Sequence, residues 1–303
     1  MATLLHIDTA GEKAMVAISQ NGVLKAIQEN EVFQTHASFL QVAIQTLVAE
    51  TAIPLKSIDA IAVTMGPGSY TGLRVGLSSA KGIAYALNKP IIGLSTLALL
   101  ANAASKQAWF IEKKAQVQIF AMIDAKRMEV FGAIYDSKLN CQLAEQAIVI
   151  DSNYLTSLIE KLPTLCIGSA ATKAMALVED PALFYVEQSY NILDNIQLAE
   201  VAFTKGEFVD TAYSSPSYLK EFFFKKLENM KNEDLIGSFI EQFYSKEILL
   251  PPKIILPVRA ALTTQKKWLR ERRGGPVRLM YGKSELDRKV LTMADENAFY
   301  SFN

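Results

Sequence analysis

The sequence is poor in the residues on which several classes of protein depend. Two cysteines, Cys141 and Cys166, cannot form a disulfide framework or a zinc ribbon, so a reducing compartment is expected. No apolar run is long enough to cross a membrane, and the N-terminus reaches Asp8 too early for a signal peptide. We therefore expect a cytoplasmic protein with no membrane partner.

An excess of charge of one sign is also lacking. The 303 residues include 31 Lys and Arg and 31 Asp and Glu, so no overall field demands nucleic acid or membrane. From Lys225 onward, however, the chain holds 15 basic and 10 acidic residues. This asymmetry indicates either two units of different origin or chance. Half of the residues are hydrophobic, enough for one large or two modest domains.

Residues 1–104 carry the pattern of a mixed sheet with helices. Short apolar segments at 3–8, 14–19 and 23–27 predict an antiparallel meander, with Asn21-Gly22 as one of its turns. Helical and strand periodicities then alternate: a helix from Thr35 to 53, a strand at 58–65, a helix at 72–87 and a strand at 90–94. This order predicts five strands flanked by helices.

Residues 105–224 repeat this rhythm without obvious residue identity. A strand ends on Asp124, as the first strand of the chain ends on Asp8. Strands at 129–135 and 143–150, a helix at 154–161, a strand at 164–167 and a later helix at 193–205 follow. Such a repeat is typical of a duplicated, two-lobed fold.

The segment GPGSYTG at 66–72 is the most informative motif. Its glycines permit positive φ and close backbone approach, and Ser69 and Thr71 can cap the next helix. One interpretation is a phosphate cradle at a helix N-terminus. The other is a tight turn where two backbones pack, which glycine content alone favours. No Gly-Lys-Ser/Thr closes the loop as in a Walker motif.

Small residues also recur at three- and four-residue steps in the helix after the loop. They are Gly72, Gly76, Ser79, Ala80 and Ala84. Such a stripe permits close helix–helix approach. It is usually core, but an exposed stripe would form a docking surface.

Four segments together resemble a known family. They are IDTA near the start, THASFLQVAIQTLVAE, GPGSYTGLRVGLSSAKGIAYAL and DAKRMEVFGAIYD at 124–136. To about Tyr218 the chain is similar to the bacterial TsaB (YeaZ) family. The resemblance implies the ASKHA fold of acetate kinase, Hsp70 and actin, and a role in making N6-threonylcarbamoyladenosine on tRNAs that read codons starting with A.

The resemblance also implies partners. The family member is a non-catalytic subunit that binds its catalytic paralogue TsaD through first-lobe helices, is joined by the ATPase TsaE and reaches tRNA through the complex. A docking face of this kind is also expected to pair with itself in isolation, giving a homodimer. The residues expected at the partner interface are Thr35, Phe39, Ala43, Ile44, Gly72, Val75, Gly76 and Ser79. The motif loop comprises Gly66, Pro67, Gly68, Ser69, Thr71 and Arg74.

In ASKHA enzymes, a carboxylate ending the first strand of each lobe helps to position magnesium and phosphate. The matching positions form a vestigial nucleotide cleft: Asp8, Thr9, Asp124 and Gly168. Their flanks lack the glycine- and hydroxyl-rich hairpin that wraps phosphates, so ATP and magnesium are expected to bind only weakly or through partners. The alternative for the two aspartates is a local role in turns.

Chemistry of the chain's own is not expected. The catalytic relative uses a His-x-x-x-His helix, whereas His36 is followed four residues later by Leu40 and the other histidine is His6. A two-histidine metal site therefore cannot form. The alternative function is a glycoprotease-like (M22-type) peptidase or an ASKHA phosphotransferase acting alone.

Residues 225–303 form a basic extension. Blocks at 234–244, 246–251, 273–278 and 291–298 resemble the middle of the excinuclease C protein, just ahead of its RNase H-like nuclease domain. The resemblance implies no cutting activity, because that nuclease's catalytic carboxylates are expected beyond this segment. A small α/β fold is predicted. Its basic run at 266–273, with Trp268, either contacts a nucleic-acid backbone or is a solvated amphipathic helix.

Overall fold

The computed structural model has two compact units, Met1–Phe222 and Phe223–Asn303. The residues that it describes are 2–30, 36–107, 117–187, 189–219, 236–237, 240, 244, 250–256, 262–281, 287–289 and 291–292. Among these residues, no helix has the length and apolar content that a bilayer crossing requires.

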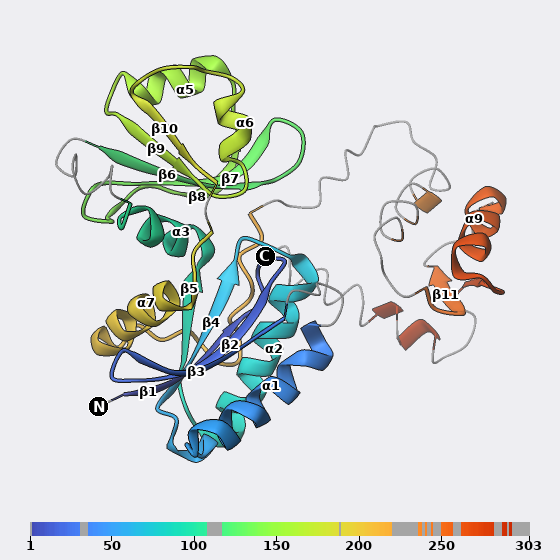
Figure 1. The fold of residues 1–303 in the computed structure, drawn as a ribbon. Coiled ribbons are helices and arrows are strands. Elements are labelled where there is room, and N and C mark those ends of the chain that lie inside the picture. The colour runs from blue at the N-terminus through green and yellow to red at the C-terminus, as the bar shows by residue number, and fades with distance from the viewer. Residues whose placement is uncertain are drawn as a thin grey trace. The chain divides into compact units, whose positions relative to one another are not determined.

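The first lobe is built on a mixed five-stranded sheet (Figure 1). Its strands are β1 (Thr3–Asp8), β2 (Ala14–Gln20), β3 (Val23–Asn30), β4 (Ala60–Gly66) and β5 (Ile91–Ser95). They lie in the order β3-β2-β1-β4-β5. The meander β1-β2-β3 is antiparallel, while β4 pairs in parallel with β1 and β5. The predicted mixed sheet is therefore confirmed.

Helices cover both faces of this sheet, so that β1, β2 and β4 are buried on both sides, whereas β3 at the edge is partly exposed. The helices are α1 (His36–Thr51), η2 (Leu55–Ser57), α2 (Tyr70–Leu87), α3 (Thr96–Ala104) and α7 (Ile192–Lys205). Side chains alternate along β1. Leu5 and Ile7 pack in the core beneath α1 and α2, whereas Leu4 packs in the core that includes α7 residues.

The second lobe repeats the arrangement. Its strands are β6 (Gln118–Asp124), β7 (Glu129–Tyr135), β8 (Cys141–Val149), β9 (Thr164–Ile167) and β10 (Leu183–Val186), in the order β10-β9-β6-β7-β8. Helices α5 (Ser152–Ile159) and α6 (Ala171–Met175) pack on one face. Helix α3 packs on the other face and also contributes Leu99 to a first-lobe core, so it lies between the two sheets (Figure 1).

The second unit is a small α/β element with its own core. Strands β11 (Lys253–Leu256) and β12 (Arg278–Tyr281) are parallel, and α9 (Thr263–Arg273) connects them. The buried core of this unit comprises Ile240, Tyr244, Leu250, Leu256, Leu262, Leu269 and Val277. Of the helix predicted at 235–244, positions 236, 237, 240 and 244 are helical and the rest lie outside the described residues.

The first-lobe core contains one buried histidine. His6 has no exposed surface, and its Nε2 lies 2.8 Å from Ser19 Oγ. Burial lowers the pKa of His6 from 6.5 to about 3, because the charged ring would lose its hydration. The folded protein therefore keeps this ring neutral at pH values where an unfolded chain would protonate it.

We expect His6 to make the fold acid-sensitive. As the pH falls below 6.5, His6 becomes protonated in the unfolded chain but stays neutral in the folded protein until about pH 3. The free energy of unfolding therefore decreases between these two pH values. In the double variant His6→Leu/Ser19→Ala neither partner is left unpaired. From about pH 7 to about pH 5, wild type should lose roughly 2 kcal/mol more unfolding free energy in urea than the variant. Equal losses would contradict this assignment.

Candidate functional site

The glycine-rich loop packs tightly against the chain that leaves β1. A Cβ atom at Gly72 would lie 2.0 Å from the carbonyl oxygen of Thr9, and one at Gly68 would lie 2.4 Å from that of Ala10. Ser69 N donates to Ala10 O at 2.7 Å, and Thr9 Oγ1 donates to Gly72 O at 2.7 Å. Of the two interpretations of the glycine-rich loop, the structure shows the tight turn in which two backbone segments pack against each other.

The remaining loop residues fix the start of α2. Ser69 caps the helix as predicted, with its Oγ accepting from Gly72 N at 3.1 Å. Thr71 is exposed and caps nothing in the described contacts. Gly66 has φ +114°, and a Cβ there would lie 2.9 Å from Leu73 Cδ1, so glycine is required. Pro67 follows it, buried, through a cis bond.

One flank of α2 is covered by the chain's own residues 208–219, here called the return segment. Lys81 Nζ donates to the carbonyls of Ala212 and Ser214, at 2.9 and 2.6 Å. Arg74 Nε donates to Tyr218 Oη at 2.8 Å, and its guanidinium stacks 4.0 Å above the Tyr70 ring. Predicted loop residue Arg74 therefore anchors the return segment to α2.

The residues predicted at the partner interface separate into an inner and an outer set, which the sequence alone did not distinguish. Ala43 and Ile44 are each 3% exposed and belong to the core beneath α1. Gly72 and Gly76 are buried because they face β1, and a Cβ at Gly76 would lie 2.3 Å from Thr9 Oγ1. Thr35 lies outside the described residues. Phe39, Val75 and Ser79 are partly exposed.

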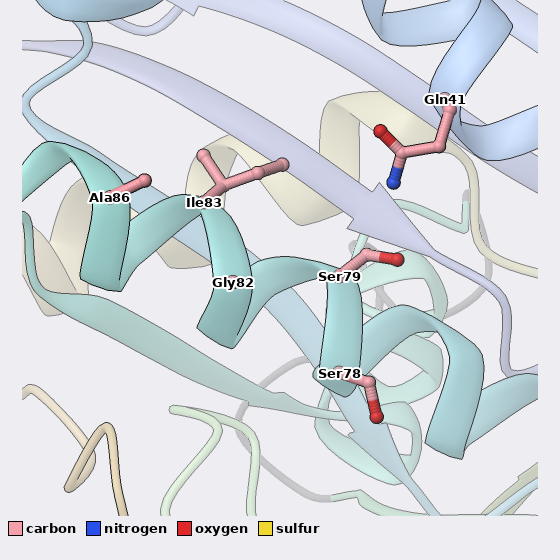
Figure 2. Close-up of a pocket in the computed structure, with 6 residues that line it drawn as sticks. All are labelled: Gln41, Ser78, Ser79, Gly82, Ile83 and Ala86. Carbon is pink, nitrogen blue, oxygen red and sulfur yellow. The ribbon is translucent and has the colours of Figure 1, made fainter.

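A shallow groove lies between α1 and α2 (Figure 2). Its volume is about 430 Å³. The residues that line it are Gln41, Ser78, Ser79, Gly82, Ile83 and Ala86. Figure 2 shows Gln41 reaching from α1 toward α2. Of this set, only Ser79 was predicted from sequence.

A sequence signal for the groove did exist. Helix α2 carries two stripes of small residues, and the bulky apolar residues of the helix distinguish them. Leu73 and Leu77 share the buried face with Gly76, Ala80 and Ala84, which marks that stripe as core. Ser78, Ser79, Gly82 and Ala86 form the second stripe, which is exposed or half-buried.

Asp8 ends β1 as predicted, but the chain itself surrounds its carboxylate. Oδ2 accepts from Thr64 Oγ1 at 2.7 Å, Tyr190 Oη at 2.9 Å and Asn195 Nδ2 at 3.0 Å. Oδ1 accepts from Ala10 N at 3.0 Å. Burial raises the pKa of Asp8, and these hydrogen bonds act in the opposite direction.

Asp124 ends β6 as predicted and is likewise engaged. Its Oδ1 accepts from Lys173 Nζ at 2.6 Å and from Lys126 N at 2.6 Å. Burial alone would raise the pKa of Asp124. The contacts with Lys173 and Lys126 outweigh this effect, so the pKa of Asp124 lies below its usual value. Gly168 has φ +110°, and a Cβ there would lie 2.2 Å from Met122 O, so its role is close packing on β6.

At the positions of the predicted nucleotide cleft, both carboxylate oxygens of Asp8 are therefore engaged within the chain, and Asp124, which is exposed, is engaged through its Oδ1. Thr9 is buried with its hydroxyl donated to Gly72, and both strand-end carboxylates accept from the chain's own donors. A hydrated cation needs carboxylate oxygens that face it. Nor, within the described part of the chain, do three or more His, Cys, Asp or Glu residues gather as a metal site would require.

Two duplicated lobes with mixed five-stranded sheets define the ASKHA class of the fold. YeaZ from Pseudomonas aeruginosa superposes with a TM-score of 0.58 at 26% identity, covering 72% of this chain and all of that one. A second structure, of an uncharacterized P. aeruginosa protein similar to peptidase YEAZ, gives a TM-score of 0.59 at 26% identity, covering 73% of this chain and all of that one.

The curated proteins to which the chain is similar include members of the TsaB family. The chain is 36% identical to the TsaB protein of Haemophilus influenzae over 145 residues, 47% of this chain and 58% of the relative. It is 34% identical to the TsaB protein of Escherichia coli K12 over 137 residues, 45% of this chain and 56% of the relative. The chain thus spans little more than half the length of these two relatives.

Residues 25–184, more than half of the chain, match the family model "TsaD: tRNA N6-adenosine threonylcarbamoyltransferase". The chain therefore belongs to that family, in which its relatives place it with the TsaB (YeaZ) members. Residues 219–303 match the UvrC ribonuclease H-like domain, which confirms the second resemblance. The predicted location just ahead of that domain is corrected, because the matching model is that of the domain itself.

Two alanine substitutions in α2 test the direction in which this helix faces. Gly72→Ala should lower the unfolding free energy by roughly 1–3 kcal/mol, because the new Cβ meets a backbone oxygen that cannot move aside. Gly82→Ala should raise it by about 0.5–1 kcal/mol, since nothing lies within 4 Å and alanine favours helix. Urea denaturation of both variants measures the difference, and similar values for the two would refute the orientation.

Proposed function

We propose that this chain is a non-catalytic subunit in the biosynthesis of N6-threonylcarbamoyladenosine in tRNA. It supports a TsaD-type transferase, and a TsaE-type ATPase joins the pair. The names of the curated TsaB relatives and the transferase description of the family model support this role. The single observation that carries the proposal is the groove of small residues between α1 and α2.

The groove has the chemistry of a helix-docking surface. Its outer stripe, Ser78, Gly82 and Ala86, is exposed and offers no bulky side chain, so a partner helix can approach closely. Large apolar side chains lie on the same helices, with Val42 of α1 61% and Tyr85 of α2 86% exposed. In isolation the same face would pair with itself around a two-fold axis.

The side chains give no support to a reaction carried out by this chain alone. The strand-end carboxylates are engaged, so ATP and magnesium act only weakly or through the partners. Both thiols are poor nucleophiles, because burial raises the pKa of Cys166, and burial followed by the Glu145 charge raises that of Cys141. The proposed role is therefore binding, in the cytoplasm, with tRNA reached through the complex.

Partner capture tests the groove. Gly82→Arg places a long cation in it without disturbing packing, because a Cβ at Gly82 meets nothing within 4 Å. Capture of a bacterial TsaD protein should fall at least about tenfold, as a loss of 1.4 kcal/mol implies. Ser157→Arg, on the exposed surface of α5, is the matched control and should capture TsaD like wild type. Unchanged capture by Gly82→Arg, with its melting temperature kept, would exclude the groove.

Nucleotide titration separates the binding role from that of an independent phosphotransferase. Calorimetry of the isolated chain with ATP and magnesium should show no saturable binding below about 1 mM. The Asp8→Asn variant should behave the same way while losing stability, because Asp8 accepts four hydrogen bonds within the fold. Tight ATP binding that Asp8→Asn abolishes would establish a working cleft and contradict the proposal.

A further inference from the structure

Helix α9 carries basic side chains, and buried contacts hold the helix itself in place. Leu269 has no exposed surface and Leu262, at the start of the helix, is 6% exposed, so one side of the helix is anchored in the core of the second unit. The far end is held by Arg273, whose Nε donates to Leu250 O at 3.2 Å and whose guanidinium donates to Pro276 O at 2.6 Å. Side chains beside this anchor therefore leave the helix in defined directions.

Three cations lie together beside the anchor. At 100° per residue, Lys266 and Arg270 are one turn apart, and Lys267 lies three residues before Arg270. Lys267 and Arg270 are exposed and Lys266 is half-buried. Within the part of the chain that the structure describes, no carboxylate pairs with any of the three. We call Lys266, Lys267 and Arg270 the basic flank.

The surroundings reinforce this charge. Residues 225–303 as a whole hold 15 Lys and Arg and 10 Asp and Glu, a net charge of +5. Of the acids that the structure describes there, Asp287 is buried and lies 2.9 Å from Lys253 Nζ, and Glu271 lies on α9 itself. A row of cations on a unit of net positive charge complements a phosphodiester backbone.

Trp268 adds an aromatic surface to this helix. Trp268 is half-buried because it packs against the core of the second unit, and the Arg272 guanidinium lies 5.7 Å from the centre of its ring. An aromatic ring beside cations stacks well on unpaired bases, which the loops of a folded RNA offer and a closed duplex does not.

We propose that the second unit binds tRNA, with the basic flank of α9 on the phosphates and Trp268 against an unpaired base. The choice of tRNA among RNAs rests on the proposed function of the first unit. The proposal extends that function, because it gives this chain its own contact with the nucleic acid that the complex modifies.

The test uses the full chain and fluorescence anisotropy with labelled tRNA at about 50 mM and about 200 mM salt. In the triple variant Lys266→Gln/Lys267→Gln/Arg270→Gln, affinity at the lower salt should fall about tenfold or more. The slope of log K against log salt should become shallower by about 2 to 3, because up to three phosphate contacts are lost. The control Lys25→Gln/Lys138→Gln/Lys161→Gln removes equal charge from exposed positions of the first unit and should bind like wild type.

Three results would overturn the proposal. They are no saturable tRNA binding at the lower salt, an equal loss in the control variant, and stronger competition by duplex DNA of matched phosphate number than by unlabelled tRNA. Capture of TsaD, measured on the same proteins, reports on the proposed function separately. A chain that binds tRNA through α9 but fails to capture TsaD refutes the first proposal and keeps this one.

Discussion

The close contact between the first turn of α2 and the chain after β1 determines much of the first unit. Because residue 72 has no side chain, the carbonyl of Thr9 can lie where a Cβ would otherwise be. Helix α2 then sits against the end of β1 with its glycine stripe inward. The same contact fixes the rotation of the helix, so that the second small-residue stripe faces outward and forms one wall of the groove.

A buried carboxylate then links the elements that meet behind this contact. Asp8 on β1 receives hydrogen bonds from Thr64 on β4 and Asn195 on α7, and from Tyr190, which packs against three core clusters. Burial and the neighbouring Asp8 charge raise the pKa of Tyr190, so it remains a donor. A buried carboxylate is tolerated only when its oxygens are satisfied. Asp8 therefore joins β1 to neighbouring elements of the fold through its hydrogen bonds.

Sequence reasoning located the strands well because each is a buried apolar run with a clear end. The duplication was visible because Asp8 and Asp124 end equivalent strands, β1 and β6. Helix α3 was missed because its nine residues are almost wholly apolar and show no periodicity. Strand β10 was also missed.

The candidate site was predicted less well, for a physical reason. Spacing alone cannot tell an inward stripe of small residues from an outward one, so the sequence left open which predicted interface residues face outward. In the structure, Gly72 and Gly76 face inward. The partners of Asp8 were not predictable either. Tyr190 and Asn195 lie 182 and 187 residues away along the chain, and only the tertiary fold brings them to β1.

The zero net charge of the whole chain conceals two opposite fields. Residues 1–224 hold 16 basic and 21 acidic residues, whereas 225–303 hold 15 and 10. At physiological ionic strength charges are screened within about 8 Å, so a polyanion senses the nearest surface rather than the sum. Since each unit has its own core, the basic surface can attract RNA without altering the packing of the acidic unit. An electrically neutral protein can thus offer one unit to a protein partner and another to a nucleic acid.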